Sequence, residues 1–424
     1  MAYDLLQVAP ARDVPAFKPA WSLWAILAVV IVGGGAACVI RFWPPTEPIN
    51  TPWFWTCVVA FPLFSWLIPF FIYLGVLQAS RRRAIDFNNA RHGYLTDIGR
   101  KASVPLHVLG SGFLFSATEH ENTAEAVTQR RLTLTQQSRF PEDTEPVSAR
   151  WIVPEGRTWL PTDDQSDMER HREVLPYVFD ALLLQIAPAI RVLPERTRLT
   201  VRLAVATLLP TSEVEAAWRD KWMALELRVT AKAEIDSTPP ELIAADLWID
   251  GKGVAHSDAA NLLCVVQLNS LLNAVPDDGS AEAGVIVLFA SSSLTARKQL
   301  SSTTLLFRPE LRDEKGIGQG LRQAMLWGHV RSSELTDQWM TGGAEAPLNR
   351  ALASELDAQA VEVAKTKDLS GQHDVDFWLG SAGIAAPWLC MALAMQQARE
   401  SGRKQLISIA RAQRLTLAVV APRS

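Results

Sequence analysis

The sequence predicts an α/β protein in which two N-terminal transmembrane helices precede a layered α/β region. Residues 21–80 hold two long apolar segments with almost no charged side chains. Beyond residue 104, short apolar runs alternate with longer segments of helical periodicity, as in mixed α/β folds. One run, Ala283 to Ala290, is apolar throughout, which is typical of a strand that helices cover on both faces.

The two N-terminal segments are long enough to cross a bilayer. Trp21 to Ile40 and Trp53 to Leu77 contain no charged residue, and about 20 apolar residues suffice for one crossing. Tryptophans stand near the predicted ends, where indole rings prefer the lipid headgroups. The basic residues that follow the second segment are Arg81, Arg82, Arg83, Arg91, Arg100 and Lys101, whereas the connecting loop has only Arg41. The positive-inside rule therefore places the α/β region in the cytoplasm, beside a short cytoplasmic arm of residues 1–20.

The cytoplasmic region divides into elements by their hydrophobic patterns. Alternating or continuous apolar runs predict strands at Val104–Ser116, Arg198–Thr207, Leu225–Ala233, Leu242–Trp248, Ala283–Ala290, Gln405–Ala410 and Arg414–Ala421. Helical periodicity predicts helices at Val174–Val192, at Gly316–His329, at Ala346–Val363 and at Ala382–Arg399. The last two strands predict a closing hairpin that joins the sheet. We expect a juxtamembrane and strand-containing subdomain at 81–145, a first α/β half at 146–280 and a second α/β half at 281–424.

Composition excludes several classes of function. The net charge is −4, so no basic field points to nucleic acid, and we expect no nucleic-acid partner. The four cysteines, Cys38, Cys57, Cys264 and Cys390, are far apart, and no Cys/His cluster has metal-ligand spacing. We therefore expect no disulfide framework, no metal site and no cofactor.

One stretch, LSGQHDVDFWLGSAGIAAPW at Leu369 to Trp388, carries the clearest motif. Lys367, Gly371 and Gln372, followed by the small residues of Gly380 to Gly383, lead into the apolar helix. Together with the elements after residue 280, this order resembles the carboxy-terminal half of the thiolase and ketoacyl-synthase superfamily, with its Lys-x-x-x-Gly-His loop. The resemblance implies a layered, thiolase-like fold.

The resemblance also implies a chemistry that this sequence does not complete. Acyl transfer of this type needs a cysteine thiolate at a strand-to-helix turn and two His or His/Asn groups that polarise the acyl carbonyl. Gln372 stands where the second histidine is expected, with His373 one position late, and Trp339 to Gly343 (WMTGG) has no histidine. Cys264 and Cys390 both lie inside apolar runs. The sequence thus predicts a catalytically inactive thiolase-like scaffold with Lys367, Gly371, Gln372 and His373 as its degenerate loop.

Three weaker motifs have structural alternatives. GIGQG at Gly316 to Gly320 fits either a phosphate-binding loop or a simple helix entry, and it lacks the GxGxxG pattern. His373 with Asp374 and Asp376 has metal-like residue types, but a solvated loop is the preferred interpretation. Trp218 and Trp222, spaced i and i+4, fit either a partner-binding anchor or a helix core.

A second resemblance concerns the whole chain. The order of a membrane segment, VPLHVLGSGFLF, VLPYVFDALLLQI and a thiolase-like end is similar to the bacterial adaptor family for lipase effectors of type VI secretion. That resemblance implies a two-pass protein of the bacterial inner membrane that binds a lipase effector in the cytoplasm and delivers it to the secretion spike protein. It implies no particular binding residue. Two alternatives stay open: a membrane-bound thiolase-like acyl-binding protein or acyltransferase, and an immunity protein that neutralises a toxin.

Overall fold

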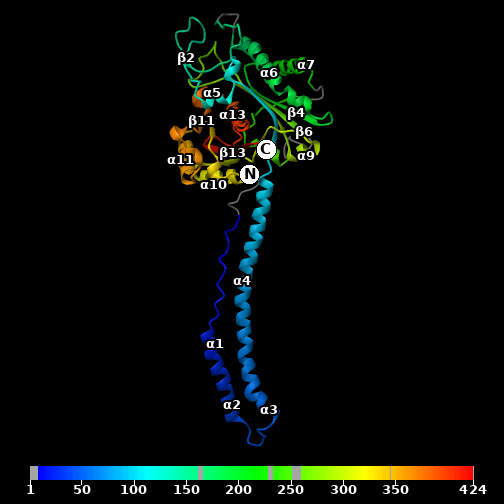
Figure 1. Ribbon diagram of the computed structural model, residues 1–424, viewed down its shortest axis with the longest axis vertical. Helices are drawn as coiled ribbons and strands as arrows, with labels where there is room; N and C mark the ends of the chain where they lie inside the picture. The colour runs from blue at the N-terminus through cyan, green and yellow to red at the C-terminus, as the bar shows by residue number, and fades with distance from the viewer. Residues whose placement is uncertain (1–7, 161–165, 228–232, 251–258, 344, 424) are drawn as a thin grey trace. The chain divides into compact units, whose positions relative to one another are not determined.

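The computed structural model describes residues 8–160, 166–227, 233–250, 259–343 and 345–423. The chain divides into two compact units, residues 3–98 and residues 99–424, and each is described by itself. The first unit contains the apolar N-terminal helices, and the second contains the α/β region (Figure 1).

The N-terminal unit is built from two long helices. The first is continuous through α1 (Trp21–Ala28), the π-helical turn η2 (Val29–Gly33) and α2 (Gly34–Phe42). The second runs through α3 (Pro52–Trp55), η3 (Thr56–Ala60) and α4 (Phe61–Ala102). Both are long and apolar enough to cross a membrane, as the sequence predicts.

The two apolar helices pack closely through small and aromatic residues. A Cβ added at Gly35 would lie 2.9 Å from the Pro62 ring, so the backbones approach there because Gly35 has no side chain. The Trp66 indole N–H donates to the Trp24 carbonyl at 3.0 Å, and its ring stacks on Phe70 with centroids 5.0 Å apart. Small residues and interhelical hydrogen bonds are what hold helices together in lipid.

The α/β unit contains one large mixed sheet. Its strand order is β11-β10-β12-β13-β8-β1-β7-β6-β4-β5, and β9 (Glu310–Arg312) pairs with β13 off this path. The strands of the path are β1 (Leu106–Leu114), β4 (Arg198–Ala206), β5 (Ala233–Ile235), β6 (Ala259–Gln267), β7 (Ala283–Ala290), β8 (Thr304–Leu306), β10 (Gln338–Thr341), β11 (Gln372–Asp374), β12 (Gln405–Arg411) and β13 (Arg414–Pro422). A separate small sheet pairs β2 (Gln136–Gln137) with β3 (Val147–Ser148).

This sheet repeats one topology twice. Strands β1, β4, β5, β6 and β7 form a first set, and β8, β10, β11, β12 and β13 a second; counted along the chain, each set has the order third-second-fourth-fifth-first. In both sets the third and fourth strands run parallel to the second. The fifth strand is antiparallel to the fourth and the first. In space, the two sets join through the antiparallel pair β1–β8. Along the chain, the first set ends with β7 and the second begins with β8, so the boundary between the halves lies between these two strands. The sequence pattern predicts this boundary at residue 280.

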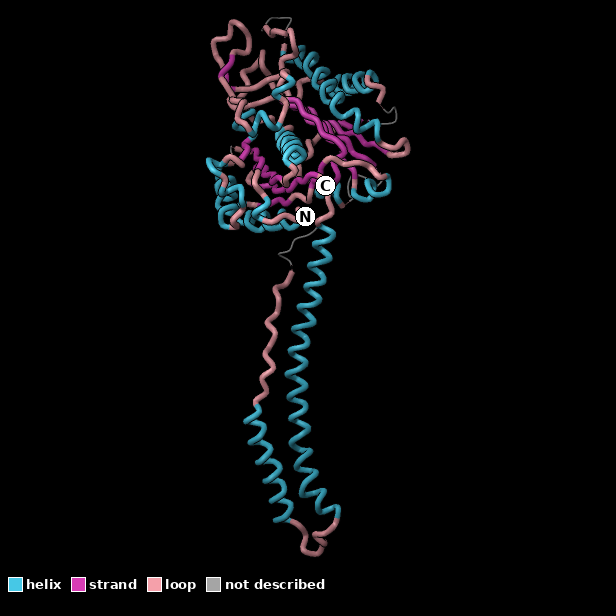
Figure 2. Tube along the Cα trace, viewed as in Figure 1, coloured by secondary structure: helices cyan, strands magenta, loops and turns pink. Residues whose placement is uncertain are grey.

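Helices cover both faces of the sheet. α6 (Asp167–Val192) and α7 (Thr211–Ala224) share a core with the first set of strands, and α10 (Ile317–Trp327) and α11 (Ala346–Ala358) share one with the second. α8 (Ala244–Ile249) and α13 (Ala386–Ser401) lie in a third core, to which both sets contribute. Figure 2 shows α13 nearly end-on between the two groups of strands. α6 also has the length and hydropathy of a membrane span, but half of that window is buried in the fold.

Strand β7 shows why its sequence is continuously apolar. Val285, Val287 and Phe289 belong to the central core, while Ile286 and Leu288 belong to the core beneath α6. Because both faces are covered, no position along the strand favours a polar side chain. The predicted doubly buried strand is therefore confirmed.

Most other predicted elements are confirmed, with β1, β4, β12 and β13 among the strands and α6, α10, α11 and α13 among the helices. The predicted strand at Leu242–Trp248 is wrong: the segment forms helix α8, because its buried Trp248 packs into the central core. Of the predicted strand Leu225–Ala233, residues 228–232 lie outside the described residues, and the strand there, β5, begins only at Ala233. The remaining short helices are α5 (Ala124–Thr128), α9 (Ser292–Lys298) and α12 (Val375–Leu379).

Candidate acyl-transfer site

The Lys-x-x-x-Gly loop of the sequence ends in β11, which lies parallel beside β10. Gly371 lies so close to the segment before β10 that an added Cβ would lie 2.1 Å from the Thr336 carbonyl oxygen. Gln372 pairs in register with Gln338, and Lys367 lies exposed on the 3-10 turn Lys367–Leu369. The glycine thus serves close backbone packing, and the loop does not bring its four predicted residues to one point.

His373 is buried and held by a carboxylate. Its Nε2 lies 3.0 Å from Asp337 Oδ1, and its ring lies 4.6 Å from that of Trp339, its register partner on β10. Burial raises the pKa of Asp337, but the hydrogen bonds from His373 and from the Thr336 hydroxyl outweigh it, so the pKa lies below its ordinary value. The expectation of a solvated loop around His373 is therefore wrong.

The two aspartates after His373 have structural partners. Asp374 accepts from the Phe377 backbone N–H at 3.1 Å and caps α12. Asp376 accepts from the Thr341 hydroxyl and from the Gly342 N–H, each at 2.7 Å. Within the described residues, no group of three or more His, Cys, Asp and Glu side chains could hold a metal ion. These carboxylates fix the end of β10 to α12.

Neither cysteine of the α/β unit is placed as a nucleophile. Cys264 lies in the middle of β6 and Cys390 inside α13, and both are fully buried. Burial raises the pKa of Cys264; burial also raises that of Cys390, with a further contribution from Asp376 and Asp374. Because the thiolate is the reactive form, both thiols are poor nucleophiles at neutral pH.

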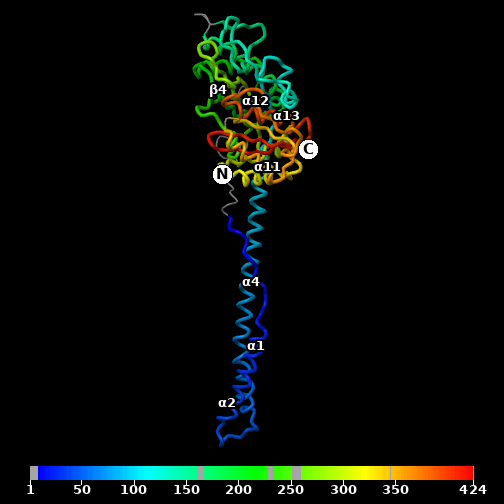
Figure 3. The backbone as a smooth tube through the Cα atoms, turned by 90° about the vertical axis from the view of Figure 1, so that its left-hand side faces the viewer, coloured from blue at the N-terminus to red at the C-terminus, as the bar shows by residue number. Residues whose placement is uncertain are grey.

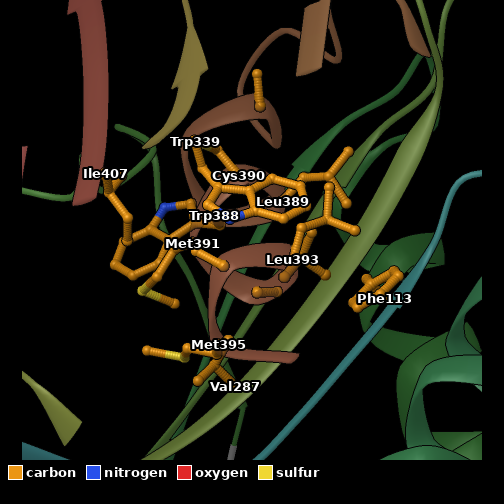
Figure 4. Close-up of a cluster of buried hydrophobic side chains, with 14 of the residues drawn as sticks. Phe113, Val287, Trp339, Trp388, Leu389, Cys390, Met391, Leu393, Met395 and Ile407 are labelled. Atoms are coloured by element: carbon orange, nitrogen blue, oxygen red, sulfur yellow. The ribbon is translucent and has the colours of Figure 1, made fainter. Parts of the chain in front are cut away.

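Tryptophan fills the strand-to-helix turn of the first half. Segment 236–243 connects β5 to α8 and contains no cysteine. The Trp388 indole N–H donates to the Pro240 carbonyl in that segment at 2.7 Å, and the ring stacks on Trp248 of α8. Figure 4 shows Trp388 in the central cluster with Trp339, Cys390 and Met391. This strand-to-helix turn is thus packed against an indole and offers no thiol.

A cavity of about 390 Å³ opens beside this turn. Glu241 and Leu242 line it from the turn, Pro387 from the first turn of α13, and Arg411 and Arg414 from the β12–β13 hairpin. Arg411 lies 3.9 Å from Glu241. Exposed pairs of this kind contribute little to stability, so the entrance is polar and easily rearranged.

The remaining sequence motifs have structural roles. Trp218 and Trp222 are buried, and Trp218 packs edge-on against Phe179 of α6 with centroids 5.2 Å apart. They belong to the core between α6 and α7, which is the helix-core alternative of the two that the sequence left open. In GIGQG, a Cβ added at Gly318 would fall 2.3 Å from a Glu355 carboxylate oxygen. That carboxylate occupies the space a phosphate would need, and the glycine serves the packing of α10 on α11.

Sequence reasoning missed two partners in this region. Asp337, which directly precedes β10, hydrogen-bonds His373 of β11. Trp248, in the first half of the fold, stacks on Trp388 in the second half. Both contacts join segments far apart in the chain. No local spacing signal could have indicated them.

The α/β unit has a thiolase-like, ketosynthase-type fold. It is similar to the ketosynthase from module 6 of the bacillaene synthase from Bacillus subtilis 168, with a TM-score of 0.52 and 8% identity, over 76% of this chain and 71% of that chain. Two further similar structures are the ishigamide ketosynthase/chain length factor (TM-score 0.49, 14% identity, 76% of this chain and 100% of that chain) and the ketosynthase from module 1 of the bacillaene synthase from Bacillus amyloliquefaciens (0.48, 12%, 76% and 77%). No protein-family model matches the sequence, and no curated protein matches it. At these identities the likeness shows the fold, and the predicted layered α/β class is confirmed.

Proposed function

We propose that this chain is a non-enzymatic, membrane-anchored adaptor that binds a lipase effector in the cytoplasm and delivers it to a type VI secretion spike. The observation that carries the proposal is the indole of Trp388 hydrogen-bonded to the Pro240 carbonyl, at a strand-to-helix turn that contains no cysteine. A fold of this class without an accessible thiolate has surface and rigidity to offer a partner. Its two cysteines, Cys264 and Cys390, are fully buried, which disfavours a thiol nucleophile.

Membrane anchoring supports delivery by this adaptor. The proposal takes Trp21–Phe42 and the apolar start of Pro52–Ala102 as a two-pass anchor in the bacterial inner membrane. Arg81, Arg82 and Arg83 then lie at the cytoplasmic headgroups. A tethered adaptor keeps its cargo at high effective concentration near an envelope-spanning machine. A reporter fusion at the C-terminus tests the topology, since a periplasmic α/β unit would favour an immunity protein instead.

Affinity purification tests the partner. The full chain, tagged at the C-terminus and solubilised in mild detergent, should recover a lipase and a secretion spike protein together. A variant that retains both helices but carries a destabilised α/β unit, such as Trp388→Ala, should lose the lipase. Recovery of neither protein by the wild type would contradict the proposal.

A second candidate is an acyl-binding protein or acyltransferase on the same fold. The cavity beside Glu241 and Leu242 favours it, because it opens next to the strand-to-helix turn. Its test is the binding of a long-chain acyl-CoA by the purified chain, before and after His373→Ala and Cys264→Ala. Tight binding that either change abolishes would support this candidate. Absent binding by the wild type would remove it, and tight binding that both changes leave intact would show acyl binding that does not use His373 or Cys264.

A further inference from the structure

An exposed aromatic patch lies on α12 and the turn before β11. Phe377 is 66% exposed and Leu369 is 51% exposed. Among the described residues of the α/β unit, Phe377 is the only phenylalanine, tyrosine or tryptophan in the exposed class. Together with Trp378, Arg130 and Lys367, these two residues form what we call the Phe377 patch.

Arg130 ties the patch together. Its guanidinium donates to the Asp368 carbonyl at 3.3 Å and lies 5.8 Å from the Trp378 ring centroid, over the ring face. The Trp378 ring in turn meets Phe377 edge-on, with centroids 4.8 Å apart. The patch is therefore one connected surface, although its residues come from segments more than 200 positions apart in the chain. Figure 3 shows α12 close to α13, which anchors the patch to the central core.

The backbone of the patch is held in an unfavourable conformation. Arg130, Asp368 and Leu369 all have positive φ angles, of 53°, 54° and 52°. Asp tolerates this region, but leucine rarely adopts it. Arg130 follows the C-terminal end of α5, where its N–H donates to the Val127 carbonyl, and a left-handed residue is common at such a position. The Leu369 side chain is exposed to solvent on the turn before β11.

We propose that the Phe377 patch is the surface on which the adaptor holds its protein cargo, and this inference rests on the proposed function. The cargo segment presents an apolar side chain to Phe377 and Leu369 and a carboxylate to Arg130 and Lys367. Trp and Arg are enriched at binding hot spots, where a few anchors carry most of the free energy. A carboxylate that pairs with Arg130 gains a charge-assisted hydrogen bond in a site the aromatic rings help to exclude from water.

The groove next to the patch has room for the cargo segment to continue. It has a volume of about 490 Å³ and begins at Arg131, the neighbour of Arg130. Residues 131–135, which lie outside any strand, line it, and so do Arg150 and Trp151. Arg131 pairs with Glu125 at 3.6 Å and Arg150 with Glu121 at 3.4 Å, so the groove carries charges of both signs beside Trp151.

A protein partner fits this surface better than a bilayer. Aromatic and basic residues also bind lipid headgroups. The exposed Asp368 side chain, however, lies next to Leu369 within the patch and would be repelled by anionic lipid. The patch therefore carries charges of both signs, with Asp368 beside Arg130 and Lys367, and a protein surface with mixed charges fits it better than an anionic bilayer.

Binding measurements on the full chain in detergent test the proposal. The probe is the lipase recovered by the wild-type chain, purified and titrated against immobilised adaptor. Phe377→Ala and Leu369→Ala should each weaken binding by about tenfold or more. Arg130→Glu should weaken it further, and most strongly at low salt. Leu184→Ala, at a leucine of α6 that is 55% exposed, is the matched control and should bind as the wild type does.

The possible results distinguish failure of the Phe377 patch as the binding surface from failure of the adaptor function. Wild-type capture of the lipase with unchanged binding by both alanine variants overturns the patch and leaves the adaptor function standing. Absence of any lipase from the wild-type sample overturns both. A bilayer partner is tested with the chain in nanodiscs, with a bimane label at Phe377→Cys in a background of Cys38→Ala and Cys57→Ala. Quenching of the label by brominated lipid would overturn the protein partner, and quenching by added lipase alone would support it.

Discussion

The Trp388 indole of α13 stacks on the Trp248 indole of α8, with ring centroids 5.8 Å apart and 17° between the ring planes. One helix belongs to each half of the duplicated topology, so this pair joins the halves through the central core. Phe289 of β7 meets both rings, at 5.5 Å from Trp248 and 6.1 Å from Trp388. The space between the central helices is therefore filled by aromatic side chains.

Replacing Trp388 should destabilise the whole α/β unit. Trp388→Ala removes a fully buried side chain together with its hydrogen bond to Pro240, and such changes cost about 3–5 kcal/mol. Chemical denaturation of the detergent-solubilised chain measures the loss. Trp388→Phe, which keeps a stacking ring but loses the hydrogen bond, should cost clearly less. Equal losses in the two variants would mean that the stack contributes nothing.

The buried cysteines should resist alkylation in the native protein. Cys264 and Cys390 are fully buried with raised pKa values, so both the access and the thiolate that iodoacetamide needs are lacking. Mass spectrometry after treatment at pH 7.5 should find both unmodified, and both modified once the chain is unfolded. Rapid native modification of Cys390 would revive the idea of a nucleophile.

Replacing only one member of the Arg170–Glu282 ion pair should strongly destabilise the α/β unit. Both side chains are fully buried, and the guanidinium bonds both carboxylate oxygens, at 2.6 and 2.9 Å. Removal of one partner leaves a buried unpaired charge, which costs about 3–5 kcal/mol.

Arg170→Met tests this by thermal unfolding, and the double variant Arg170→Met with Glu282→Gln should recover part of the loss. The glutamine is neutral and still accepts from the Ile152 or Asn269 N–H that Glu282 bonds. A double variant that is less stable than Arg170→Met would show that the buried charge is not the cause.

Acid should destabilise the α/β unit through His171. Its Nδ1 accepts from the Leu208 N–H at 3.1 Å, and its Nε2 faces the Asn269 carbonyl at 3.1 Å, a pattern that suits the neutral ring. Burial lowers the pKa of His171 below its ordinary value of 6.5. The unfolded chain therefore binds the proton more readily, so this contribution is present above about pH 6.5 and is lost as the pH falls toward the folded-state pKa.

The melting temperature of the wild type should fall between pH 7.5 and pH 5.5. In His171→Gln that pH dependence should be shallower, although the variant is less stable at pH 7.5. An identical pH dependence in both proteins would rule out His171 as its source.

The parts of the fold that the sequence predicts are those whose burial leaves a local pattern. Strand β7 is continuously apolar because both faces are covered, and the closing hairpin β12–β13 joins two largely apolar strands by a short polar turn. Helix α8 left no such pattern. It is six residues long, and its Trp248 is placed by contact with Trp388, 140 positions later.

The candidate site was predictable only in its local parts. The missing cysteine and the glycines could be read directly, but Asp337 as the partner of His373 could not, because strand pairing brings them together. Trp218 and Trp222 show a further limit: an i, i+4 pair of indoles has the same spacing whether it faces the core or a partner. Phe377 lies in the motif that resembles an acyl-transfer loop, and only its 66% exposure marks it as a surface residue.

A secretion assay measures the central claim most directly. In the source bacterium, deletion of this chain should abolish extracellular delivery of the lipase while the spike protein is still secreted and the lipase still accumulates inside the cell. Wild-type chain supplied in trans should restore delivery, and the chain with both Phe377→Ala and Leu369→Ala should not. Unchanged lipase delivery after the deletion would contradict the adaptor function.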